Sequence, residues 1–176
     1  MAVFWGFVLL LAILALFLLV SGIWPTIFGA PWVPTRRKQV DSLLALAEVT
    51  SEDIVYDLGC GDGRILFAAA RKYGARAVGI EIEPFKYLWC QLLISLLGLR
   101  KQVTVRLGNL FDADIRDATV VVVYLLKETN QRLSTKLKRE LTPGTRVISN
   151  IFTFPEQEPI KEKDQLLLYI VDGGET

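Results

Sequence analysis

The sequence contains no histidine among its 176 residues. That absence excludes Ser-His-Asp and Cys-His catalysis and any metal site with imidazole ligands. Cysteine is scarce as well: Cys60 and Cys90 form neither a disulfide framework nor a CxxC motif, a pattern typical of a reducing compartment. A net charge of +1 gives no electrostatic reason to expect a nucleic-acid partner.

Charged side chains are missing from residues 1–35, and residues 3–24 form a mainly apolar run, VFWGFVLLLAILALFLLVSGIW. About 20 apolar residues in a helix span the hydrocarbon core of a bilayer. Trp5 and Trp24 stand near the two ends, where interfacial aromatic residues are expected. A cleaved signal peptide would have a basic start and a shorter apolar stretch. We therefore predict a retained transmembrane anchor over residues 1–24, in preference to a cleaved signal.

Basic residues at positions 36–38 follow this run, and no basic side chain precedes it. The positive-inside rule then predicts a single-pass membrane protein with its catalytic domain on the cytoplasmic side and the bilayer as a partner. Residues 25–37 are rich in proline and glycine and are predicted to be a linker. The folded domain is expected over residues 38–176.

Strand and helix patterns alternate along this domain. Strands are expected at 54–57, 77–81, 103–107, 120–125, 146–152 and 166–171, and helices at 38–47, 64–73, 84–97 and 130–141. Such alternation predicts an α/β fold with a mostly parallel sheet and helices on both faces. The helix at 84–97 is apolar almost all round. Its excess apolar surface predicts a contact with the anchor, another subunit or the membrane interface.

Three glycines, at positions 59, 61 and 63, separate the first strand from the next helix. Ligands of such sheets bind at this turn, where the helix offers unpaired N–H groups. A phosphate loop would end in Gly-Lys-Ser or Gly-Lys-Thr, and a dinucleotide fingerprint would have glycine in place of Arg64. Asp57, two residues ahead of the turn, suits an ammonium better than a pyrophosphate, which it would repel.

The segment 57–63, DLGCGDG, resembles the first motif of the seven-strand, class I S-adenosylmethionine-dependent methyltransferases. The resemblance implies a doubly wound Rossmann-like sheet and S-adenosyl-L-methionine as the cofactor. It implies that Gly59, Gly61 and Gly63 pass the methionine moiety, that Asp57 lies near its amino group, and that Glu81 binds the ribose hydroxyls.

The same resemblance places the adenine. Ile82 would lie against the base and Leu110 would cover it. Asn109 stands where the family often has an acidic residue facing adenine, a departure that still supplies an amide for hydrogen bonding.

Residues 31–40, PWVPTRRKQV, resemble the segment before the domain in a small group of membrane-anchored lysine methyltransferases, those of the adenine nucleotide translocase and the ATP synthase c subunit. This implies that Val33, Pro34 and Thr35 fold over the cofactor as a lid. It also implies a lysine of a membrane protein as the methyl acceptor. Because an Arg-rich transit peptide is absent, a prokaryotic membrane is favoured over a mitochondrion.

Tyr124, near the end of the fourth strand, is the candidate catalytic residue. Its ring could face the sulfonium and its hydroxyl could bond the acceptor amine, although an aromatic residue at the rim of the site fits equally well. Asn150 is a second candidate of the same kind. Two other functions stay open: methylation of a membrane-dissolved quinone or lipid, and a non-catalytic scaffold that binds S-adenosylmethionine. No oligomeric state is predicted.

Overall fold

The computed structural model describes residues 1, 4–13, 15, 35–155 and 157–172. The chain divides into two compact units, Met1–Trp32 and Val33–Thr176. In the first unit, residues 4–13 are helical, and their large apolar side chains are exposed.

The predicted single-pass membrane location, with a cytoplasmic catalytic domain, is wrong on the structural finding. No helix in the described part of the chain combines the length and the apolar character that crossing a bilayer requires. Much of the predicted span, residues 16–24, lies outside the described residues.

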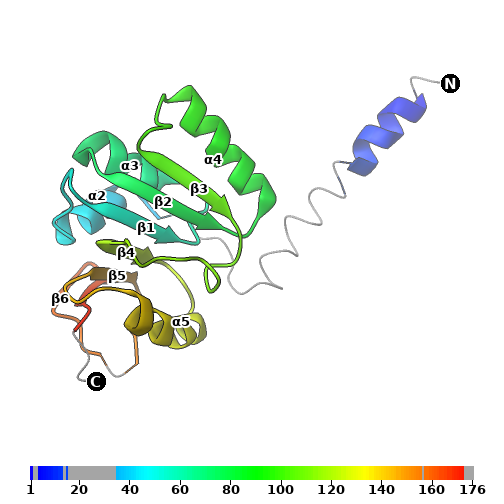
Figure 1. The fold of residues 1–176 in the computed structure, drawn as a ribbon. Helices are drawn as coiled ribbons and strands as arrows, with labels where there is room; N and C mark the ends of the chain where they lie inside the picture. Colours follow the sequence, from blue (N-terminus) through cyan, green and yellow to red (C-terminus); the bar gives the residue numbers. More distant parts are fainter. Residues whose placement is uncertain (2–3, 14, 16–34, 156, 173–176) are drawn as a thin grey trace. The chain divides into compact units, whose positions relative to one another are not determined.

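The second unit is built from alternating strands and helices (Figure 1). Its helices are α2 (Arg37–Leu46), α3 (Arg64–Tyr73), α4 (Pro84–Leu96) and α5 (Lys127–Glu140). Its strands are β1 (Ile54–Leu58), β2 (Arg76–Glu81), β3 (Val103–Leu107), β4 (Val120–Val123), β5 (Arg146–Asn150), β6 (Lys161–Lys163) and β7 (Leu166–Ile170).

The strands form one sheet of seven, in the order β3-β2-β1-β4-β5-β7-β6. Strands β1 to β5 run parallel, whereas β7 pairs antiparallel with β5 and with β6. The strand order reverses between β1 and β4, which is where open parallel sheets bind their ligands. The predicted mostly parallel α/β sheet is confirmed.

Helices cover both faces of the sheet, but unequally. On one face, α2, α3 and α4 pack a core against alternate strand residues such as Val55 and Val120. On the other face, α5 packs over the residues between them, Tyr56 and Val121, together with the loop that contains Ile115. Because helices cover both faces, side chains on both sides of a central strand are buried, so its sequence is apolar throughout. In β4 all four valines are buried.

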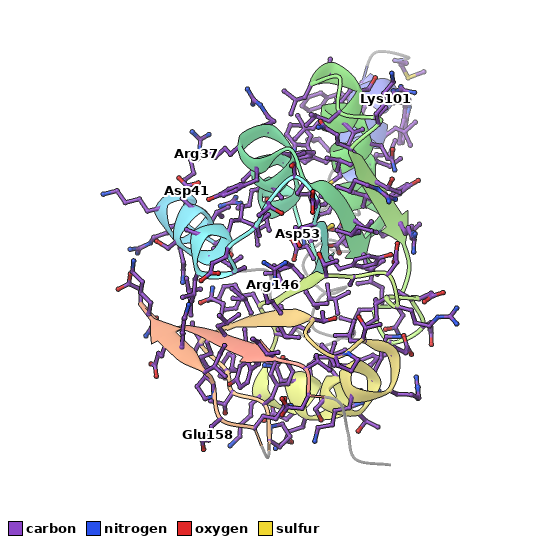
Figure 2. The ribbon with its side chains drawn as sticks, turned by 60° about the vertical axis from the view of Figure 1, so that its left-hand side comes forward. Arg37, Asp41, Asp53, Lys101, Arg146 and Glu158 are labelled. Carbon is purple, nitrogen blue, oxygen red and sulfur yellow. The ribbon has the colours of Figure 1, made fainter. Side chains whose placement is uncertain are left out.

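An ion pair closes the amino-terminal end of the sheet. Arg146, the first residue of β5, pairs with Asp53 just before β1, and Figure 2 shows the two side chains close together. The Arg146 guanidinium also donates to the carbonyls of Ala47, at 2.6 Å, and Glu48, at 3.0 Å. These contacts tie the end of α2 to two strands and leave the opposite edge for a ligand.

Helix α4 buries only part of its apolar surface. Cys90 and Ile94 are buried, but the following large side chains stay exposed in the described structure: Phe85, Leu88, Trp89, Leu92 and Leu96. The apolar excess expected from the sequence is therefore present on the surface of this unit. What covers it stays a prediction.

Candidate functional site

The carboxyl ends of four neighbouring strands meet in one row. Leu58 of β1 pairs with Ile80 of β2 and with Val123 of β4. Val123 in turn pairs with Ser149 of β5. The residues directly after these paired positions are the following: Glu81 and Asn150, which end β2 and β5, and Gly59 and Tyr124, which follow β1 and β4. Three of these were predicted as primary site residues from sequence, and Asn150 as a second acceptor-side candidate.

The glycine turn requires its glycines. Gly59, Gly61 and Gly63 have φ angles of 87°, 56° and 77°, a left-handed conformation that strains residues with a Cβ atom. The N–H groups of Gly59 and Cys60 donate to the carbonyl of Ile80, at 2.9 and 3.1 Å, which binds the turn to β2. The turn ends at the amino terminus of α3, where unpaired N–H groups favour electron-rich ligand atoms.

Glu81 holds the turn from the side of β2. One carboxylate oxygen accepts the Gly61 N–H at 2.7 Å and the other accepts the Glu83 N–H at 2.9 Å. Burial raises the pKa of this carboxyl, and the two backbone N–H groups counteract that rise. Each oxygen keeps a second lone pair, so Glu81 can accept two hydroxyl groups in addition to supporting the turn.

Asp57, the fourth residue of β1, is only 4% exposed. Burial, followed by the charges of Glu81 and Asp62, raises the pKa of its carboxyl to about 8. A cation bound beside this carboxyl would lower its pKa and favour the ionised form.

A close-packed layer supports the turn from below. Cys90 of α4 donates from Sγ to the carbonyl of Gly61 at 3.4 Å, and Cys60 is buried beside it. A hydrogen bond with Cys90 and burial raise the pKa of the Cys60 thiol well above its usual value. A thiol held protonated in this way serves packing and not nucleophilic attack.

Arg64 links the turn to the segment before α2. Its guanidinium pairs with Asp62, as expected for neighbouring charges, and also donates to the carbonyl of Thr35. Thr35 is buried, so the structure brings one of the three predicted lid residues to the glycine turn. Val33 and Pro34 lie outside the described residues.

The predicted adenine contacts lie beside β2 and after β3. Ile82 and Leu110 are half-buried, and Asn109 is exposed. The Gly108 N–H donates to the carbonyl of Glu81 at 2.9 Å, which holds this segment against β2. The side-chain oxygen of Asn109 accepts the N–H of Phe111 at 3.0 Å and so shapes the turn.

Two polar side chains at the site, those of Glu83 and Gln39, were not predicted from the sequence. Glu83 is buried; its Oε2 lies 3.2 Å from Lys86 Nζ, and its Oε1 has no hydrogen-bond partner in the described structure. Glu83 is the second acidic residue of the sequence EIEP, two positions after Glu81, and this spacing is the sequence feature that could have pointed to it. Gln39 of α2 donates to Asn150 at 2.8 Å, a contact between residues 111 positions apart that no local pattern indicates.

Comparisons with known proteins identify this arrangement. A family profile, the ANTKMT methyltransferase domain, matches residues 57–161. A protein-lysine N-methyltransferase of Saccharolobus islandicus is 43% identical over 76% of this chain and 86% of its own length. The mouse adenine nucleotide translocase lysine N-methyltransferase is 31% identical over 85% of this chain and 67% of its own length.

A solved structure agrees with the fold. The RNA methyltransferase from Salinibacter ruber, in complex with S-adenosyl-L-homocysteine, superimposes with a TM-score of 0.79 at 40% identity, covering 82% of this chain and 97% of its own. Its ligand is the product that S-adenosylmethionine becomes on losing its methyl group, which agrees with the cofactor that the resemblance of residues 57–63 implied. This chain belongs to the ANTKMT methyltransferase domain family and is an S-adenosylmethionine-dependent methyltransferase.

Proposed function

We propose that this enzyme methylates the side-chain amine of a lysine in a protein. The observation that carries the proposal is the 43% identity to a protein-lysine N-methyltransferase along 86% of that protein. The acceptor end of the site fits an uncharged amine, since the row continues from Gly59 into neutral polar side chains, Tyr124 and Asn150.

The cofactor, when bound, supplies a methyl group on positively charged sulfur, already activated for displacement. In our proposal Asp57 holds its ammonium group, and Glu81 accepts the ribose hydroxyls while keeping Gly61 in place. The glycine turn allows close approach of the methionine moiety. Positioning of this kind lets the protein contribute several kcal/mol without forming a covalent intermediate.

Three further sets of residues complete the proposed site. Ile82, Asn109 and Leu110 would surround the adenine. Thr35, held by Arg64, would close over the cofactor, together with Val33 and Pro34. Tyr124 would orient the acceptor amine, which must be neutral to attack, although the usual pKa of lysine is about 10.4.

The finer part of the proposal concerns the target. We infer that the methylated protein is a membrane protein, on the support of the 31% identical relative named for the adenine nucleotide translocase. RNA is the second candidate, because the solved structure with 40% identity is named an RNA methyltransferase.

The test incubates the purified full chain with methyl-tritiated S-adenosylmethionine and three acceptor preparations: membranes, soluble protein and total RNA from the expression host. We expect label in a protease-sensitive membrane band, and mass spectrometry of that band should locate the added methyl on lysine. Label on a lysine of a soluble protein would support lysine methylation but refute the proposal that the target is a membrane protein. Ribonuclease-sensitive label, label in extracted lipid or quinone, or cofactor binding without transfer would each overturn lysine methylation.

We expect Glu81→Gln to weaken binding of S-adenosylhomocysteine by roughly tenfold or more. The amide has one oxygen in place of two and directs an N–H group at a backbone donor, either Gly61 or Glu83. Isothermal titration calorimetry measures the affinity, and Glu162→Gln on the exposed strand β6 is the matched control. Equal affinities in the two variants would contradict the ribose role of Glu81.

A further inference from the structure

Asn150 carries a buried polar atom that the fold leaves unused. The side chain is 1% exposed, and its Nδ2 has no hydrogen-bond partner in the described structure. Its Oδ1 is engaged, since it accepts from Gln39 Nε2 at 2.8 Å. Buried amide groups are normally fully paired, so an unpaired one calls for a reason beyond stability.

The register gives Asn150 a functional position. The neighbouring strands β1, β4 and β5 carry paired residues near their carboxyl ends, and the next residue along each chain segment is Gly59, Tyr124 and Asn150, in that order across the sheet. Glu81, the predicted ribose ligand, lies on the other side of Gly59. Asn150 is therefore at the end of the row remote from the nucleoside.

The backbone around Asn150 is held firmly. Ile151, the next residue, has a φ of 73°, a left-handed conformation that a β-branched residue rarely adopts. Its N–H donates to Gln165 at 2.8 Å, and the carbonyl of Phe152 accepts from Asn130 at 3.0 Å. Backbone strain of this kind persists only where the surroundings enforce it.

We propose that Asn150 contacts the acceptor amine during methyl transfer, and that Gln39 is the positioning residue that holds its amide. The proposal rests on lysine as the acceptor. A rotation of about 180° about the Cβ–Cγ bond of Asn150 exchanges the positions of its Oδ1 and Nδ2 atoms. If the Gln39 amide rotates in the same way, Asn150 Nδ2 donates to Gln39 Oε1 and the two side chains stay hydrogen-bonded. In that state Oδ1 faces the acceptor and accepts an N–H of the amine, while the amine lone pair stays free to attack.

The electron balance explains why an amide suits this position. The nitrogen lone pair forms the new bond to the methyl carbon, and the carbon–sulfur pair leaves with sulfur, which becomes a neutral thioether. Positive charge develops on nitrogen, so its hydrogen bond to Oδ1 strengthens in the transition state. The extra proton then passes to water. A carboxylate would also accept this bond, but it would raise the pKa of the amine and reduce its reactive neutral fraction.

The first experiment uses a library of lysine-centred peptides and tritiated cofactor, followed by kinetics on the most strongly labelled peptide. We expect Asn150→Ala to lower kcat by roughly tenfold or more with S-adenosylhomocysteine affinity unchanged. Asn150→Asp, which keeps the shape of the side chain, should move the acid limb of the pH–rate profile to higher pH. Unchanged kcat in the first variant and an unshifted profile in the second would overturn the proposal.

Gln39→Glu and Gln39→Leu separate positioning from mere packing. A glutamate at position 39 accepts from Asn150 Nδ2 and so fixes Oδ1 toward the acceptor. We therefore expect Gln39→Glu to keep kcat and Gln39→Leu to lower it, at equal cofactor affinity. An inactive Gln39→Glu variant with normal cofactor affinity and melting temperature would refute the assigned orientation.

A second measurement does not depend on the proposed function. Titrating n-butylamine into the complex with S-adenosylhomocysteine should shift the side-chain amide NMR signals of Asn150, which are assigned by their loss in Asn150→Ala. If the wild-type enzyme labels no lysine peptide but these signals shift, the proposal of protein-lysine methylation is refuted and the proposed contact between Asn150 and an amine is supported. If lysine is methylated and the signals stay fixed, the Asn150 contact fails.

Discussion

Replacing Asp57 with asparagine is expected to stabilise the ligand-free protein near pH 8 and to weaken cofactor binding at the same time. In the folded protein burial and the charges of Glu81 and Asp62 raise the pKa of this carboxyl from 3.8 to about 8. Between those pH values the unfolded chain has released a proton that the folded chain keeps. The free energy of unfolding therefore falls as pH rises, by up to about 1.4 kcal/mol per pH unit. The asparagine amide does not titrate, so the free energy of unfolding of the variant does not fall with pH for this reason.

Urea unfolding of both proteins between pH 4 and 9, without ligand, measures the effect. The stability difference should widen up to about pH 8 and then stay constant. Asp164→Asn is the control, because Asp164 is exposed and its φ of 50° is one that asparagine tolerates. A variant at position 57 that is less stable than wild type at pH 8 would show that Asp57 is not held protonated.

The same substitution should lower affinity for S-adenosylhomocysteine roughly 10- to 100-fold, because it removes the charge that faces the ligand ammonium in the proposed site. Binding to the wild-type protein below pH 8 should release a proton from Asp57, and binding to the variant should not. Calorimetry in buffers with different ionisation enthalpies counts that proton. Equal proton release in the two proteins would mean that the ammonium binds elsewhere.

Gly79→Ala is expected to have the largest effect on folding. A Cβ at this position of β2 would lie 2.5 Å from Leu66 Cδ1 and 2.6 Å from Cys60 Sγ. Overpacking of this kind costs about 1–3 kcal/mol, which for a domain of this size lowers the melting temperature by several degrees. Because Cys60 belongs to the glycine turn, cofactor affinity should fall as well.

Gly108→Ala is the matched control, since a Cβ there meets nothing within 4 Å. Differential scanning calorimetry compares the two variants with the wild type. Similar melting temperatures for Gly79→Ala and Gly108→Ala would contradict the tight packing of the sheet under the turn.

Local pattern was sufficient for most of the fold. The apolar runs predicted the strands, the glycines at 59, 61 and 63 predicted the turn, and the acidic residue at the end of the second strand pointed to Glu81, which contacts that turn. The element ends were harder. Leu125 extends the apolar run of β4, yet it lies outside the strand and packs near Gly59. Ile151 extends β5 in the sequence, but its left-handed backbone ends the strand.

Contacts between distant residues could not be predicted. Arg64 reaches the carbonyl of Thr35, and Gln39 reaches Asn150, across 29 and 111 positions. Strand β6 was missed because its three residues are all charged and exposed. The predicted membrane location rested on the hydrophobicity of residues 3–24 alone, and no helix in the described part of the chain is long and apolar enough to cross a bilayer.

The sheet ends at β6, whose residues are Lys161, Glu162 and Lys163. If two copies met edge to edge in antiparallel register centred on Glu162, that residue would face its own copy and Lys161 would face Lys163. Like charges directly opposite one another destabilise a strand pair. In that register the edge at β6 repels a second copy, which disfavours this edge-to-edge pairing.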